Sequence, residues 1–168
     1  MKIISGGQTG VDRAALDAAI ELGIPHGGFV PKGRLAEDGA IPSRYLVSEI
    51  SSSDYALRTE INVLAAHATL IFYREKLSGG TYYTWILCKK HKKPFCLVDL
   101  AVQGSPAAAG EVVQFLKKEK PGILNVAGPR ESNARGIYKE AKTVLLEALK
   151  PDRKPLKSRG PNSAAATN

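Results

Sequence analysis

The stretch MKIISGGQTGVDRAALDAAIELG (residues 1–23) predicts a strand, a glycine-rich turn and a helix, in that order. Residues 2–5 form the short, mostly apolar strand. Apolar residues then recur at positions 11, 14, 15, 18, 19 and 22, which is the period of a helix that ends at Gly23. A strand that passes through glycines directly into a helix is typical of the α/β class.

The same alternation of strand and helix continues to residue 150. We expect further strands at residues 29–30, 68–73, 94–100 and 123–128, and helices at residues 56–67, 81–92, 107–118 and 136–150. No hairpin signal interrupts this order, which indicates βαβ units and a parallel sheet. The sequence therefore predicts an α/β fold, doubly wound and Rossmann-like, with helices on both faces of a parallel sheet.

Two segments depart from this alternation. Residues 31–56 contain Pro, Gly and Ser, show little periodicity and predict a long excursion, a kind of segment that is usually functional or mobile. Residues 150–168 are basic and hold one apolar residue of any size, Leu156, so we expect a disordered basic tail after a ligand-binding domain of residues 1–149. An arm that binds nucleic acid is the alternative for this tail.

Composition narrows the class of protein. The chain has 168 residues, 43% hydrophobic and 24% charged, as in an ordinary soluble domain. No apolar run approaches the roughly 20 residues that cross a bilayer, and polar residues interrupt any secretory signal, so we expect a cytoplasmic protein without a membrane partner. Cys88 and Cys96 should be free thiols, and the three histidines lack metal-site spacing, so no metal is assigned. The net charge of +8 is compatible with anionic ligands but too diffuse to indicate nucleic-acid binding.

Three glycine-containing loops follow predicted strands and precede predicted helices: GGQTG (residues 6–10), SGGT (residues 78–81) and GPRES (residues 128–132). Right-handed crossovers bring the carboxyl ends of parallel strands to one edge, so the loops should converge there. Glycines let backbone N–H groups approach a phosphate, and a helix N-terminus favours negative charge. The first loop matches neither the dinucleotide fingerprint nor a Walker A loop. We therefore predict one phosphate site, with plain turns and helix caps as the alternative.

Side chains near these loops complete the predicted site. Thr9 supplies a hydroxyl, and Arg13, one helical turn on, a guanidinium. Lys32 and Arg34 in the excursion would close over the phosphate, and Asp99 would accept N–H groups from a heterocycle; a solvated basic loop and a turn aspartate are the alternatives. The candidate ligand-binding residues are Gly6, Gly7, Gln8, Thr9, Gly10, Arg13, Lys32, Arg34, Ser78, Gly79, Gly80, Thr81, Asp99, Arg130 and Ser132.

Five motifs in order carry a resemblance: GGQTGVDRAALDAAI, PKGRLAEDGAIPSRY, TEINVLAAHATLIF, SGGT and GPRES followed by GIY. Together they resemble the molybdenum-cofactor carrier family, part of a wider group of Rossmann-like nucleotide-binding proteins that includes the lonely-guy phosphoribohydrolases and the DNA-processing proteins. The resemblance covers residues 1–149. It implies a homo-oligomer that binds a phosphorylated small molecule, proposed to be the molybdenum cofactor, with molybdoenzymes as partners. It also implies that Gly7, Thr9, Gly10 and residues 78–81 line the phosphate site.

The chain departs from the hydrolase relatives in the second loop. Those relatives have the form PGGxGTxxE, whereas this chain has SGGTYYTWILC, with no Asp or Glu between Thr81 and Asp99. Cleavage of an N-glycosidic bond needs a general acid or base, or a carboxylate that stabilises the positive charge on the ribose, and Glu60 is the only substitute that we consider for the missing residue. The sequence thus favours a binding or carrier protein for the molybdenum cofactor or a nucleotide. The alternative is a phosphoribohydrolase-like enzyme that acts on nucleoside monophosphates, with Glu60 catalytic.

Overall fold

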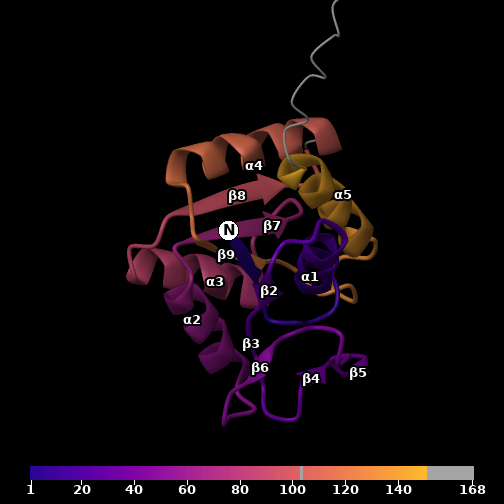
Figure 1. Ribbon diagram of the computed structural model, residues 1–168, viewed down its shortest axis with the longest axis vertical. Helices are drawn as coiled ribbons and strands as arrows, with labels where there is room; N and C mark the ends of the chain where they lie inside the picture. Colours follow the sequence, from indigo (N-terminus) through magenta and orange to yellow (C-terminus); the bar gives the residue numbers. More distant parts are fainter. Residues whose placement is uncertain (103, 151–168) are drawn as a thin grey trace, which may run out of the picture.

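A computed structural model describes residues 1–102 and 104–150, so the expected tail lies outside the described residues except for Lys150. Its centre is a five-stranded sheet in the order β2-β1-β9-β7-β8, in which every pair of neighbours is parallel (Figure 1). The strands are β1 (Lys2–Ile4), β2 (His26–Gly27), β7 (Ala68–Tyr73), β8 (Phe95–Asp99) and β9 (Ile123–Ala127).

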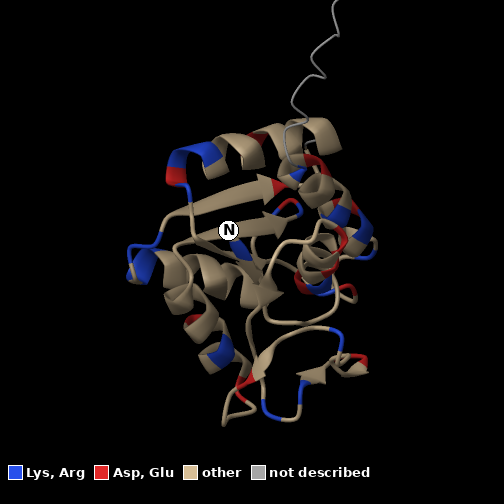
Figure 2. Cartoon of the chain, viewed as in Figure 1, with Lys and Arg blue, Asp and Glu red and all other residues tan. Residues whose placement is uncertain are grey.

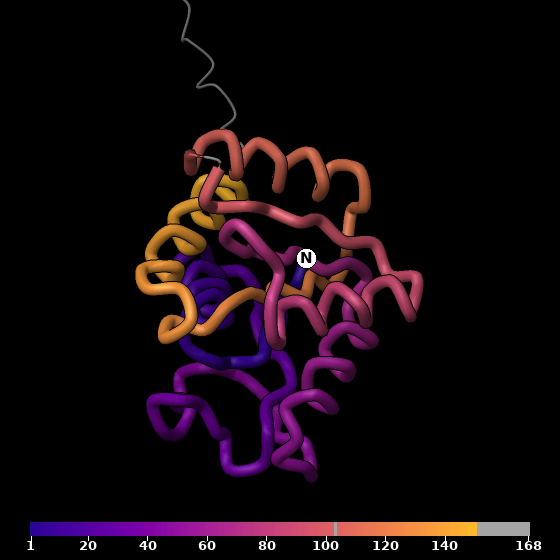
Figure 3. The backbone as a smooth tube through the Cα atoms, turned by 180° about the vertical axis from the view of Figure 1, so that it is seen from behind, coloured from indigo at the N-terminus to yellow at the C-terminus, as the bar shows by residue number. Residues whose placement is uncertain are grey.

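Five helices cover the two faces of this sheet, as the tube seen from behind also shows (Figure 3). One face packs α1 (Val11–Glu21), α4 (Ser105–Glu119) and α5 (Ile137–Leu149); the other packs α2 (Tyr55–Ala65) and α3 (Gly79–Lys90). The alternation along β7 follows from the pleat, because Leu70 and Phe72 join the first core while Ile71 joins the second. The predicted doubly wound α/β fold is confirmed.

The strand order places a switch point between β7 and β9. If the strands were numbered from β7 instead of β1, the sheet would have the doubly wound order 2-1-3-4-5. In such sheets ligands bind outside the carboxyl ends of the two strands at which the order reverses. The loops after β7 and β9 are therefore the first place to look for a site.

Strand β3 (Phe29–Val30) has the predicted bounds but lies outside the central sheet. It pairs in parallel with β6 (Ser48–Glu49), and β2 forms the sheet edge instead. Gly28 causes the departure: its φ is 128°, and a Cβ there would lie 2.0 Å from the Ser5 carbonyl oxygen. The chain thus passes against the end of β1 in a conformation that favours glycine, and leaves the sheet.

The expectation of no hairpin is wrong for the excursion. Strands β4 (Leu35–Ala36) and β5 (Gly39–Ala40) pair antiparallel around Glu37 and Asp38. The dipeptide Asp38-Gly39 is a hairpin signal, but strands of two residues with exposed side chains show no alternation beside it. The excursion is anchored by a separate small core of Leu16, Val30, Ile41 and Tyr45.

Candidate functional site

A cavity of about 450 Å³ opens at the switch point between β7 and β9. All three glycine loops reach it: Gln8 from the first, Ser78, Gly80 and Thr81 from the second, and residues 128–130 from the third. The structure therefore brings together the loops that parallel topology predicted at one edge. The volume of this cavity lies within the range of small-molecule binding sites.

The cavity wall is strongly basic. Its carboxylates are Asp12 and Glu75, against five cationic side chains: Arg58, Arg74, Lys76, Arg130 and Arg135. Figure 2 shows basic and acidic positions side by side in the turn after β7, which supplies Arg74, Glu75 and Lys76. An excess of cations in a concave site attracts an anion. Of these five cations, only Arg130 was predicted from the sequence. Arg74 directly follows a predicted strand, and its position at the strand end could have indicated a place in the site, but the prediction considered only the glycine-containing loops.

Arg58 reaches the first glycine loop from α2. Its side chain is 13% exposed, and its Nη1 lies 3.5 Å from Asp12 Oδ2. The guanidinium occupies the space above Gly6, where a Cβ would lie 1.5 Å from Nη1. The glycine at position 6 therefore makes room for an arginine, a role that the loop sequence alone did not indicate.

Two buried donors in this part of the site lack a protein partner among the described residues: Gln8 Nε2 and Arg58 Nε. Gln8 is 7% exposed, and its Oε1 accepts from the backbone N–H groups of Thr9 and Glu37, which fixes the amide. A buried donor without an acceptor costs free energy that a ligand acceptor can recover. Both donors belong to residues that line the basic cavity.

Asp12 lies beside these donors with a perturbed pKa. Burial raises the pKa of this carboxyl above its usual range, and the Arg58 guanidinium opposes the rise. When the pKa of a carboxyl is higher in the folded than in the unfolded protein, the fold loses stability as the pH rises through the folded-state pKa.

We expect Arg58→Met to destabilise the protein more near neutral pH than near pH 4, by about 3 kcal/mol at neutral pH, because the buried carboxylate loses its partner. Urea unfolding at the two pH values measures the difference. Adding Asp12→Asn to Arg58→Met should remove the pH dependence. Equal destabilisation at both values would show that Arg58 acts only through packing.

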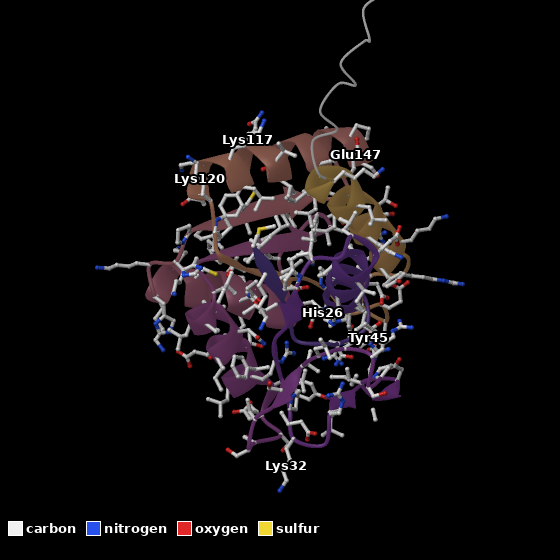
Figure 4. The ribbon with its side chains drawn as sticks, viewed as in Figure 1. His26, Lys32, Tyr45, Lys117, Lys120 and Glu147 are labelled. Atoms are coloured by element: carbon white, nitrogen blue, oxygen red, sulfur yellow. The ribbon has the colours of Figure 1, made fainter. Side chains whose placement is uncertain are left out.

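The other predicted side chains lie outside this cavity. Arg13 donates to the Gly7 carbonyl oxygen at 3.2 Å and forms an ion pair with Asp38 at 2.5 Å. Lys32 is exposed at the outer end of the excursion (Figure 4). Asp99 accepts from the backbone N–H groups of Glu75 and Ala101, the turn arrangement that was its alternative role.

Arg34 organises the excursion itself. Its guanidinium donates to the carbonyl oxygens of Ile41, Pro42 and Tyr45 at 2.8–3.0 Å, and its Nη1 also reaches that of Val47. With all three of its guanidinium nitrogens bonded to backbone carbonyls, Arg34 shapes the segment that carries the hairpin. The structure does not bring it to the predicted phosphate site.

Glu60, the candidate catalytic carboxylate, is also held elsewhere. Its Oε1 lies 2.9 Å from Lys90 Nζ and 2.7 Å from His91 Nε2, at the far end of α3. Hydrogen bonds from Lys90 and then His91 lower the pKa of Glu60. It does not line the cavity, so the substitute proposed for the missing hydrolase carboxylate is not in reach of a ligand there.

The remaining expectations concern thiols, metals and membranes. Cys88 and Cys96 are free, as expected, and both are buried. Burial raises the pKa of Cys96 to about 12. Residues 1–102 and 104–150 contain no group of three His, Cys, Asp or Glu side chains that could hold a metal ion. Within the same ranges, no helix has the length and apolar character to cross a membrane.

A second cavity, of about 440 Å³, lies on the other side of the first and third loops. Thr9, Gly10 and Arg13 face it from one side, and Glu131 and Tyr138 from another. Asp17 accepts hydrogen bonds from the hydroxyls of Tyr45 and Tyr138 in its wall, at 2.9 and 2.7 Å.

Comparison with known proteins identifies relatives. The model of the circularly permutated YpsA SLOG family matches residues 3–149. The crystal structure of a putative molybdenum carrier protein from Syntrophus aciditrophicus SB is similar, with a TM-score of 0.86 and 44% sequence identity over 88% of this chain and 94% of that one. No curated protein shows significant similarity to the chain. A permuted family accords with a sheet order that becomes regular when the strands are numbered from β7.

Proposed function

The chain belongs to the circularly permutated YpsA SLOG family, and from this premise we propose that it binds and carries a phosphorylated small molecule, with the molybdenum cofactor as the first candidate and a nucleotide as the second. The similarity to a molybdenum carrier protein supports the first candidate. On this proposal the protein acts in the cytoplasm as a homo-oligomer and passes its cargo to molybdoenzymes. The proposal rests above all on the basic cavity at the switch point.

The donor set of the cavity fits the phosphate end of such a cargo. The cofactor is a phosphorylated pterin, and Arg58 and Arg130 bring guanidinium groups, which pair well with phosphate oxygens, to the cavity wall. Arg74 is also in the wall, but its guanidinium is bound to the Glu140 carboxylate and donates to the Arg135 carbonyl oxygen. The side-chain amide of Asn133, also in the wall, can meet the polar edge of a heterocycle.

The test is to identify what the purified protein carries. Small molecules released by denaturing the full chain are analysed by mass spectrometry, and molybdenum is measured in the same sample. We expect a phosphorylated pterin with molybdenum, and much less of both from Arg58→Met than from Arg44→Met, an exposed arginine outside the basic cavity. A purified protein that carries no phosphorylated compound and takes none up when one is supplied would overturn the proposal.

We also expect the protein to release no base from nucleoside monophosphates. Glu60 is bound to Lys90 and His91, and the cavity carboxylates are Asp12, which is paired with Arg58, and Glu75, which lies in the turn after β7. Loss of one preorganised electrostatic group costs a factor of roughly 100–1000 in rate. Free adenine, guanine and cytosine are measured over time beside a Glu60→Gln variant. Turnover that disappears in this variant would make Glu60 catalytic after all.

A further inference from the structure

Glu37, at the tip of the β4–β5 hairpin, has its carboxylate among donors from two other loops. The Thr9 hydroxyl donates to Oε1, and the Ser132 hydroxyl donates to Oε2 at 2.5 Å. The Ser132 backbone N–H lies 3.3 Å from Oε1, and Arg130 Nη1 lies 3.7 Å from Oε2. The Glu37 side chain is 19% exposed, so these contacts are partly shielded from water.

None of these donors belongs to the hairpin. They come from the first and third glycine loops, at the carboxyl ends of β1 and β9. Thr9 Oγ1 also accepts from the Glu131 backbone N–H at 3.2 Å, which leaves its own hydrogen to point at the carboxylate. Two hydroxyls, one backbone N–H and one guanidinium around a single anion form the donor set of an oxyanion site. The loops would keep this set if the hairpin moved away.

The donors around Glu37 lie between the two cavities. Gln8 and Arg130 face the basic cavity, whereas their neighbours Thr9 and Glu131 face the second one. An anion bound to Thr9, Arg130 and Ser132 would thus sit beside a phosphate in the basic cavity, with Arg130 near both. A ligand with two linked phosphoryl groups could occupy both positions.

The hairpin is lightly attached. Apart from the Glu37 carboxylate, the hairpin is held by the Asp38 ion pair with Arg13, in which Asp38 is 47% exposed, and by the Glu37 backbone N–H, which donates to Gln8 Oε1 at 2.9 Å. Ala36 packs partly against the small core. Leu35 is 43% exposed, and β5 is exposed throughout. A segment with few buried apolar contacts opens at low cost.

We propose that Thr9, Arg130 and Ser132 form a second anion subsite for a phosphoryl group, which Glu37 fills until a ligand displaces it. This inference rests on the proposed binding function, because it assigns the ligand a second phosphoryl group. Glu37 is then a resident competitor. Ligands with two linked phosphoryl groups then make a contact that ligands with one do not make, and the hairpin lifts when such a ligand binds.

The first experiment titrates the full chain with inorganic pyrophosphate by calorimetry. Glu37→Gln should bind it at least roughly tenfold more tightly than the parent, the change expected from about one charge-assisted hydrogen bond. Adding Ser132→Ala to Glu37→Gln should reverse the gain. Glu49→Gln is the matched control, since it removes a carboxylate of the same excursion that bonds only to the Gly33 backbone N–H among the contacts described. Equal gains in pyrophosphate affinity in Glu37→Gln and Glu49→Gln would show that only the net charge of the protein matters, and would overturn the subsite.

The second experiment needs no variant. Hydrogen exchange of the hairpin amides, residues 35–40, should become faster in the parent protein when pyrophosphate is added, because the ligand takes the place of Glu37. Pyrophosphate that binds while hairpin exchange slows or stays constant would overturn the competitor role but leave the basic cavity intact as a binding site. Glu37→Gln that binds no pyrophosphate would overturn the subsite, whereas the proposed function is judged separately by the small molecules that the protein releases.

Discussion

Gly10→Ala is expected to lower the free energy of unfolding by about 2–4 kcal/mol, the largest stability loss among substitutions in the glycine loops. The φ of Gly10 is 75°, a region that disfavours alanine. A Cβ there would lie 2.4 Å from the Pro129 carbonyl oxygen and 2.8 Å from the Glu131 nitrogen. These atoms are backbone of the third loop, so the clash is relieved only if the first and third loops separate.

Gly23→Ala is the matched control at the other end of α1. Gly23 has a φ of 65°, and nothing lies within 4 Å of its would-be Cβ. Its substitution should therefore cost about 1 kcal/mol, from the backbone conformation alone. Urea unfolding of both variants separates the two contributions. Equal losses would show that the two loops do not pack as closely as the structure has them.

Binding of the phosphorylated ligand should weaken about 10–100-fold in Arg58→Met, since about one or two charge-assisted hydrogen bonds disappear. Gly6→Ala should have a similar effect without removing any charge. A Cβ at position 6 would lie 1.5 Å from Arg58 Nη1, and the guanidinium, at the end of a flexible side chain, must move away. The side chain can give way, so Gly6→Ala should cost much less stability than Gly10→Ala.

Ligand affinity and unfolding are to be measured on the same preparations. Arg44→Met serves as control, because Arg44 is 63% exposed and pairs with Asp17 beside the second cavity. Unchanged affinity in Gly6→Ala would mean that Arg58 reaches the ligand from another position or not at all. Reduced affinity in Arg44→Met to the same extent would point to the overall charge of the protein as the cause.

The fold prediction rested on the longer apolar runs and on the segments with a helical period. The apolar run Ala68–Tyr73 has the same bounds in the sequence prediction and in β7, and the helix predicted at residues 136–150 is α5, Ile137–Leu149. Strands of two residues, such as β2 and β6, have no detectable period. Their pairing depends on where Gly28 directs the chain, which is a tertiary property.

The site was predictable where the backbone determines it and not where distant side chains do. Loops at the ends of parallel strands must meet, so the convergence of Gln8, Gly80 and Arg130 follows from topology. Arg58 has no such signal, since its sequence context is an ordinary helix and its position depends on the space above Gly6. The Arg13 ion pair was missed for the same reason, because the position of Asp38 depends on an unpredicted hairpin.

The place of β1 in the sheet has a consequence for how the chain folds. Strand β1 lies between β2, which follows it closely, and β9, which pairs Leu124 with Ile3. The Ser5 hydroxyl donates to the Val126 carbonyl oxygen across 121 residues of sequence. During synthesis on the ribosome, β1 therefore keeps one open edge until β9 has emerged, and β9 must then insert between β1 and β7. Such non-local pairing slows folding, and the late insertion of β9 should be its rate-limiting step.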